Sequence, residues 1–323
     1  MIAALHRNPL AVIATLAVSG ALLWLMAHLV TVKPGVLFWI SVLVLWALVW
    51  IGNDALSGIS TLSPVATRFR NLAVPAIFGL TLLLLWQLVV KGFGISPVFL
   101  PPPSDIWVRF STSFATLKAD FIQTFLRAVL AGWAIGSLAG FLVAILCDAW
   151  GFLRRGLLPL GNLFAALPIV GVAPIMVMWF GFDWQSKAAV VVIMTFFPML
   201  VNAVTGLEAS GHLERDLMRS YGASYFDTLI KLRLPAAMPF IFNALKINST
   251  LALIGAIVAE FFGTPIVGMG FRISTEVARF SLDMVWAEIA VAAIAGSAFY
   301  GLIALVERAV TFWHPSYQSR KDQ

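Results

Sequence analysis

The chain has 323 residues, of which 61% are hydrophobic and 11% are charged, whereas soluble globular domains have about 45–50% apolar and about 25% charged residues. This composition excludes a water-soluble fold and indicates helices that cross a bilayer, each needing roughly 20 mainly apolar residues. The net charge of +6 does not indicate nucleic-acid binding, because the basic residues lie between apolar runs. Cys147 is the only cysteine, so neither an intramolecular disulfide nor a cysteine-based metal site is expected.

Eight apolar stretches are long enough to be spanning helices. They lie at 10–32, 35–52, 72–90, 121–147, 157–180, 188–207, 238–261 and 286–306. The first is too long for a signal-peptide core, so we expect it to be retained. The polar segment 53–71 separates the first two stretches from the other six. The sequence therefore predicts an all-α polytopic membrane protein of about eight transmembrane helices, in which an N-terminal hairpin precedes a six-helix core.

The basic residues predict the orientation of these helices. If the N-terminus is cytoplasmic, twelve Lys and Arg residues fall on the inner side of the membrane and seven on the outer side. Inner loops of membrane proteins carry an excess of Lys and Arg. We therefore expect both termini to be cytoplasmic.

Glycines in the fourth stretch predict close helix packing. Gly132, Gly136 and Gly140 repeat every four residues, so they lie on one side of a helix. Small residues at this spacing allow the backbone of another helix to approach closely. Helix packing is favoured over a ligand-binding role.

The charged segment 208–239 between the sixth and seventh stretches predicts two short amphipathic helices. The first is expected to end near Gly222, because glycine readily adopts the left-handed conformation that closes a helix. The second is expected to begin at Ser224, with Asp227 completing a capping box, and to stop at Pro235. Its Phe226, Leu229 and Ile230 are expected to pack against the bundle, while Lys231 and Arg233 reach water. From the residues alone, a rigid force-transmitting element and an ordinary solvated loop are equally acceptable.

The same segment resembles the EAA motif of importer-type ATP-binding-cassette (ABC) transporter permeases. That motif has the pattern Glu-Ala-Ala, three residues, Gly, nine residues, Ile-x-Leu-Pro. Here the pattern is matched in spacing by Asp216-Leu217-Met218, Gly222 and Leu232-Arg233-Leu234-Pro235. The first triplet departs from the family pattern, with Asp for Glu and Leu-Met for Ala-Ala, and Leu232 replaces Ile.

Further similarity covers roughly residues 72–315. It includes Leu100-Pro101, Ala166-Leu167-Pro168, Trp179-Phe180-Gly181, Phe196-Phe197-Pro198 and Ala259-Glu260-Phe261-Phe262-Gly263. The chain is most similar to type I permeases for nitrate, taurine, alkanesulfonates and pyrimidine-type vitamin precursors. The expected domains are thus an N-terminal hairpin and linker at 1–71, a permease domain at 72–315 and a cytoplasmic tail at 316–323.

The resemblance implies a coupling contact on this chain and a partner ATPase that binds it. In that family the EAA helix docks into a cleft of a separate ATPase, which assigns the coupling contact to the matched motif positions and their neighbour. These are Asp216, Leu217, Met218, Gly222, Ala223, Leu232, Leu234 and Pro235. The chain has no G-x-x-x-x-G-K-[ST] phosphate loop, so we expect no catalysis and no cofactor here, with ATP and Mg²⁺ on the partner.

The implied assembly lies in a bacterial inner membrane. It contains two ATPase subunits, a second permease copy or a paralogue, and a periplasmic or lipid-anchored solute-binding protein. The solute would be a small organic molecule, such as a pyrimidine-like vitamin precursor or a sulfonate- or nitrate-type anion. The residues themselves do not identify it, nor do they give the role of 1–71.

Polar and helix-breaking residues within spans are candidates for the solute pathway. Prolines and glycine in the fifth stretch can expose backbone groups to a cavity. The candidate pathway and gate residues are Pro168, Gly171, Pro174, Trp179, Phe197, Asn202, Asn248 and Glu260. A harmless kink in the fifth stretch and ordinary interhelical hydrogen bonds from the asparagines are the competing interpretations. For Glu260 we expect an ion pair with Arg272 or Arg279.

The alternative function is an ion-coupled secondary transporter. Such a protein needs ionisable groups near mid-membrane, whereas Glu260 and Glu288 lie near the ends of their stretches. An intramembrane enzyme is disfavoured, because neither H-E-x-x-H nor G-x-S-x-G occurs and the four histidines are scattered. A purely structural scaffold is a third alternative.

Overall fold

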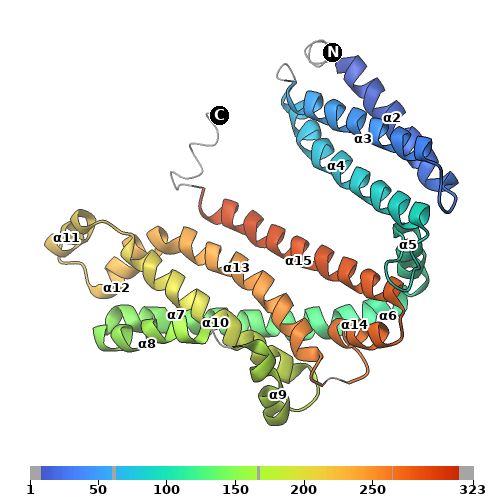
Figure 1. Ribbon diagram of the computed structural model, residues 1–323. Coiled ribbons are helices and arrows are strands. Elements are labelled where there is room, and N and C mark those ends of the chain that lie inside the picture. Colours follow the sequence, from blue (N-terminus) through green and yellow to red (C-terminus); the bar gives the residue numbers. More distant parts are fainter. Residues whose placement is uncertain (1–8, 60–62, 166–167, 264, 313–323) are drawn as a thin grey trace. The chain divides into compact units, whose positions relative to one another are not determined.

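The computed structural model describes residues 9–59, 63–165, 168–263 and 265–312, and those residues form helices without any strand. Seven helical stretches are long and apolar enough to cross a membrane: Leu10–Leu29, Val36–Ser57, Pro64–Phe93, Phe114–Ala149, Trp184–Glu208, Tyr225–Glu260 and Leu282–Val310. The apolar helix Ile169–Phe180 is shorter. The all-α polytopic fold is confirmed (Figure 1).

The predicted span at 157–180 is not one helix. It is divided between α8 (Gly151–Ala165) and α9 (Ile169–Phe180). Pro168 precedes α9 with an extended backbone, at φ −69° and ψ 117°, and its ring and missing N–H prevent an uninterrupted helical ladder. Within the described residues the long spans therefore number seven, whereas the apolar runs predicted eight.

The chain divides into two compact units, each described separately below. The first contains residues 1–112 and 280–286, and the second contains 113–279 and 287–323. In the first unit, α2 (Pro9–Leu29), α3 (Val36–Ser57) and α4 (Pro64–Phe93) pack together, followed by α5 (Pro103–Thr112). Leu23, Val42, Val49 and Leu88 form their shared core.

The second unit is built on three long helices. They are α7 (Leu130–Ala149), α10 (Trp184–Glu208) and α13 (Leu234–Glu260), with α10 packed against both others. Around them are α6 (Phe114–Phe121), the π-helix η1 (Ile122–Val129), α8, α9, α11 (His212–Ser220), α12 (Tyr225–Thr228), the π-helical turn η2 (Leu229–Arg233), α14 (Met269–Ala278) and most of α15 (Leu282–Val310).

The glycine repeat of α7 confirms the predicted close approach. A Cβ atom on Gly132 would lie 2.7 Å from the carbonyl oxygen of Ala188, and one on Gly136 would lie 2.8 Å from that of Val192. Real Cβ atoms essentially never come so near. The glycines therefore allow α7 to lie directly against the backbone of α10.

Candidate coupling site

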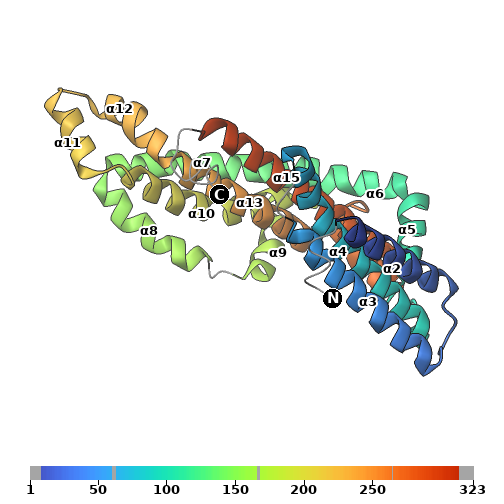
Figure 2. The same cartoon turned by 90° about the horizontal axis from the view of Figure 1, so that it is seen from above.

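The helix–glycine–helix element forms as predicted at its centre. The N–H of Ala223 donates to the carbonyl of Met218 at 3.0 Å, and the N–H of Gly222 donates to that of Arg219 at 3.0 Å. This pair of bonds is the Schellman motif, and Gly222 has the left-handed φ of 71° that the motif requires. Figures 1 and 2 both show α11 and α12 together at one end of the second unit.

Ser224 begins the second short helix, also as predicted. Its hydroxyl accepts the N–H of Asp227 at 3.1 Å and donates to the Asp227 carboxylate at 2.5 Å. Lys231 donates to the same carboxylate at 2.7 Å. These local bonds fix the chain direction immediately after Gly222.

The expectation that Pro235 stops the second helix is wrong. From Tyr225 to Glu260 the chain is one helical stretch, passing through η2 into α13. Pro235 lies in the first turn of α13, where the missing proline N–H is tolerated because the preceding π-helical turn changes the hydrogen-bond ladder. The helix–glycine–helix element is thus continuous with a long spanning helix.

The expected orientation of the second short helix is also partly wrong. Leu229 is buried, but Phe226 and Ile230 are 69% and 60% exposed. Arg233 does not reach water: its side chain is 12% exposed and pairs with Asp148 at the end of α7. Arg233 Nη1 lies 2.6 Å from Asp148 Oδ2, and a second guanidinium nitrogen contacts Oδ1.

Asp148 and Arg233 join three elements. Arg233 Nε donates to the carbonyl of Leu207 in α10 at 3.0 Å, and the Tyr225 hydroxyl donates to Asp148 at 2.8 Å. The start of the long helix is therefore tied to the ends of both α7 and α10. Sequence reasoning missed this site, although an aspartate closing an apolar run and an arginine beside a spanning helix were available signals.

The matched motif positions fall into an exposed and a half-buried group. Asp216, Leu217 and Gly222 are exposed, while Met218 and Ala223 are half-buried. Leu232, Leu234 and Pro235 are also half-buried, and Leu234 packs against the core of the second unit. One end of the element thus faces outward and the other is anchored.

Apolar side chains form an exposed row on α11. Leu213, Leu217 and Tyr221 follow one another at four-residue intervals and are 83%, 57% and 83% exposed. Residues at this spacing share one face of a helix. The adjoining α12 adds the exposed Phe226, so a hydrophobic surface lies on both sides of Gly222. Exposed patches of this kind mark interaction sites.

The candidate gate residues of α9 lie on its exposed side. Gly171 and Pro174 are exposed, Trp179 is 66% exposed, and Pro168 precedes the helix. The opposite side of α9 packs through Ala173 and Met176 against Val190 and Ala259. Phe197 is half-buried with its ring edge-on to Phe196, and Asn202 donates to the Pro198 carbonyl at 2.8 Å.

Asn248 connects the three long helices. It is fully buried, and its amide nitrogen donates to the Ser137 hydroxyl at 2.9 Å and to the Thr195 carbonyl at 2.8 Å. These bonds link α13 to α7 and α10, which is the structural role that asparagine often has in membranes. Its place in a solute pathway stays a prediction.

The expected pairing of Glu260 with Arg272 or Arg279 is wrong. The buried Glu260 carboxylate accepts the Thr124 hydroxyl at 2.7 Å and the Gly270 N–H at 2.6 Å. Arg272 instead pairs with Asp120 at 2.9 Å, and Arg279 with Glu276 at 3.3 Å. Glu260 is satisfied because the start of α14 brings a backbone donor within reach.

Comparison with known proteins decides the family. Residues 136–312, more than half of the chain, match the family described as binding-protein-dependent transport system inner membrane component. The chain belongs to this family. It is thus an ABC importer permease subunit, a transport component and not a catalytic one, in a family of the inner membrane.

Curated permeases of three organisms are similar over most of their length. A formylaminopyrimidine transport permease of Halalkalibacterium halodurans is 29% identical, over 74% of this chain and 95% of its own. A riboflavin transport system permease of Chloroflexus aurantiacus is 28% identical, over 80% and 98%. A taurine transport system permease of Escherichia coli is 29% identical, over 73% and 88%.

Proposed function

We propose that this permease is driven by a separate ATPase that docks on α11, Gly222 and α12. The observation that carries the proposal is the exposed row Leu213, Leu217 and Tyr221, presented on a short helix whose neighbour is fixed to α7 and α10. An exposed apolar face needs a partner. A short helix closed by a Schellman motif moves as one body, so displacement of α11 passes through Gly222 to α12 and α13.

The proposed assembly has two ATPase subunits that bind ATP and Mg²⁺, a second permease copy or paralogue, and a solute-binding protein on the opposite side. This chain itself would bind no cofactor. Closure of the ATPases on ATP would pull the element Asp216 to Pro235 and switch the spans between inward and outward access; hydrolysis would reset them. In this proposal residues 72–315 are the permease domain, and the N-terminus and C-terminus both lie in the cytoplasm.

The proposed solute is a small organic molecule, of the pyrimidine-precursor class or a sulfonate- or nitrate-type anion. The relatives support this range, because those compared are named for formylaminopyrimidine, riboflavin and taurine. A direct test measures which of these compounds binds the partner solute-binding protein. The candidate pathway residues would then be tested with that compound.

The docking assignment is tested with charge substitutions on α11. Leu213→Asp combined with Leu217→Asp should abolish retention of the ATPase subunits on the purified permease and remove ATP-dependent uptake in proteoliposomes. Phe152→Asp is the matched control, because Phe152 is 81% exposed but lies on α8. Unchanged retention and uptake in the double variant would refute the assignment, and uptake driven by an ion gradient without any ATPase would favour a secondary transporter.

A further inference from the structure

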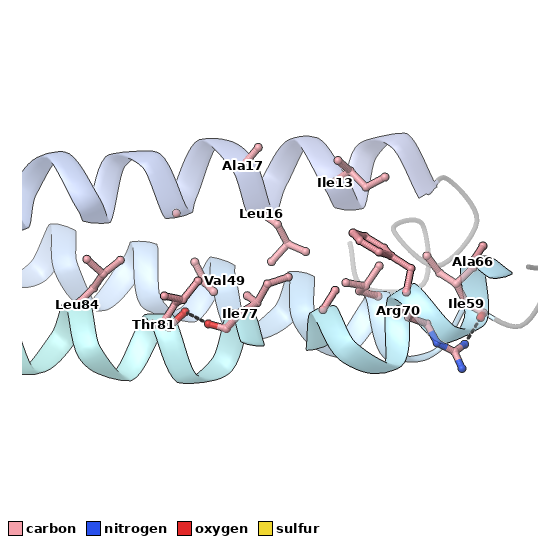
Figure 3. Close-up of a pocket in the computed structure, with 15 residues that line it drawn as sticks. Ile13, Leu16, Ala17, Val49, Ile59, Ala66, Arg70, Ile77, Thr81 and Leu84 are labelled. Carbon is pink, nitrogen blue, oxygen red and sulfur yellow. Dashed lines mark hydrogen bonds between the residues drawn. The ribbon is translucent and has the colours of Figure 1, made fainter. Parts of the chain in front are cut away.

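The first unit contains an apolar hollow that the coupling mechanism does not use. It has a volume of about 590 Å³ and lies between α2, α3 and α4. Its walls are almost entirely aliphatic, and Figure 3 shows Leu16 extending from α2 towards the wall that contains Val49 and Ile77. This size is within the roughly 300–1,000 Å³ of ligand-binding pockets.

Small residues create the hollow. Ala17 and Gly20 line it from α2, while Ala66 and Ala73 line it from α4. A Cβ atom on Gly20 would meet no heavy atom within 4 Å. α2 packs extensively against α3 but much less against α4. Space therefore remains where α2 and α4 face each other.

Water is a poor occupant of this space. Thr81 and Arg70 are the polar side chains that line it, and both have partners: the Thr81 hydroxyl donates to the Ile77 carbonyl at 2.7 Å, and Arg70 donates to the Ile59 carbonyl and to Asn71. A buried water needs two to four polar partners.

The surroundings identify a suitable apolar occupant. Wall residues Ile13, Phe69 and Leu80 are 55%, 74% and 62% exposed, so on a spanning unit they face the hydrocarbon of the bilayer. Acyl chains are the medium that solvates such surfaces. A hollow that opens between these residues is accessible to an acyl chain from the side.

Positive charge at one end of the hollow selects the type of lipid. Arg70 lies at this end, with its guanidinium turned towards the Ile59 carbonyl (Figure 3). Three of its five N–H groups are used by Ile59 and Asn71, which leaves two for a ligand. Arginines beside a spanning helix attract anionic headgroups.

We propose that the hollow binds one acyl chain of an anionic phospholipid, whose phosphate is held by Arg70. The N-terminal helices would then form a lipid-binding unit. The site lies wholly in the first unit, so its test does not depend on the coupling assignment.

The test counts lipids retained by the full-length protein. The protein is purified in detergent, given phosphatidylglycerol or phosphatidylcholine, and examined by native mass spectrometry and thermal unfolding. Wild type should retain one phosphatidylglycerol at least tenfold more strongly than phosphatidylcholine, with a raised Tm. Gly20→Leu and Ala73→Leu, which fill the hollow from opposite walls, should lose this lipid and the Tm increase.

Two further variants separate volume from charge. Gly79→Leu is the control for volume. Gly79 lies on α4 and has open space around it, but it does not line the hollow, so lipid retention should be unchanged. Arg70→Gln should retain a lipid but no longer distinguish the two headgroups. The proposal is overturned if both filling variants retain lipid like Gly79→Leu, if wild type shows no headgroup preference, or if Gly20→Leu releases a protein subunit instead of a lipid.

Discussion

Arg233 and Asp148, which are 85 residues apart in the sequence, form a two-bonded ion pair that ties the helix–glycine–helix element to α7. Their side chains are only 12% and 8% exposed. Because the Leu207 carbonyl accepts a third bond from the same guanidinium, α10 is held at the same point. Any force applied to α12 thus reaches α7 and α10 together.

Removing either partner of this pair should be costly. Arg233→Ala or Asp148→Ala leaves a buried charge without its partner, for which we expect a loss of about 3–5 kcal/mol. Thermal unfolding in detergent measures the loss. The control is Arg154→Ala, which breaks the more exposed pair with Glu208 and should cost at most about 1 kcal/mol. If the two single losses simply add in the double variant, the residues are not energetically coupled.

A β-branched residue at Gly222 should uncouple transport. Gly222 has φ 71° with open space around it, so Gly222→Val introduces backbone strain of about 1–2 kcal/mol without a steric clash. Gly181→Val is a stricter control for strain, because Gly181 has φ 83° and ψ −176°, a region that essentially only glycine adopts, and equally open space. We expect ATPase association or coupling of hydrolysis to uptake to fall only in Gly222→Val. Equal effects in both variants would mean that strain alone is responsible.

Enlarging Gly136 should separate α7 from α10. Gly136→Ala places a methyl group within 3 Å of Val192 backbone atoms, and overpacking of this kind costs about 1–3 kcal/mol. The same change at Gly156 in α8 meets open space and should be neutral or slightly stabilising. Parallel melting curves for the two variants make the comparison. A neutral Gly136→Ala would contradict the packing role.

Local patterns in the sequence predicted the parts of the site that depend on neighbouring residues. Gly222 and Ser224 behave as expected, because a Schellman motif and a capping bond each need only a few consecutive positions. The pairing of Arg233 could not be predicted in this way. Its partner is on another helix, and the π-helical turn that ends at Arg233 has no recognisable sequence pattern.

The same distinction explains Glu260. Arg272 and Arg279 follow Glu260 closely in the sequence, which suggested an ion pair. The observed partners of Glu260 are instead the hydroxyl of Thr124, far away in the chain, and a backbone N–H of α14. The chain turns at Gly268, which has φ 142° and precedes α14, and this turn brings the Gly270 N–H to the Glu260 carboxylate. This contact follows from tertiary packing, not from charge spacing.

Acid should weaken the start of α10. The amide of Gln123 donates to the Asp183 carboxylate at 2.6 Å, and this bond, aided by the Trp184 N–H, lowers the pKa of Asp183. A carboxyl group with a lowered folded-state pKa stabilises the protein above its unfolded pKa of about 4, and this contribution is lost as pH falls through the folded pKa. Tm measured from pH 6 to pH 3 should fall more steeply in wild type than in Asp183→Asn. Identical slopes would show that Asp183 contributes nothing.

The unbroken stretch from Tyr225 to Glu260 is 36 residues long, which at about 1.5 Å per residue corresponds to about 54 Å. The hydrocarbon of a bilayer is only about 30 Å thick. One helical stretch therefore extends well beyond the lipid, with the bond from Tyr225 to Asp148 at its first residue and the Thr124 and Gly270 contacts at its last. The π-helical turn η2 and Pro239 both lie in the half that carries the Asp148 contacts, and interruptions of this kind bend helices, so a tilt imposed there would reach Glu260 only through the segment after Pro239.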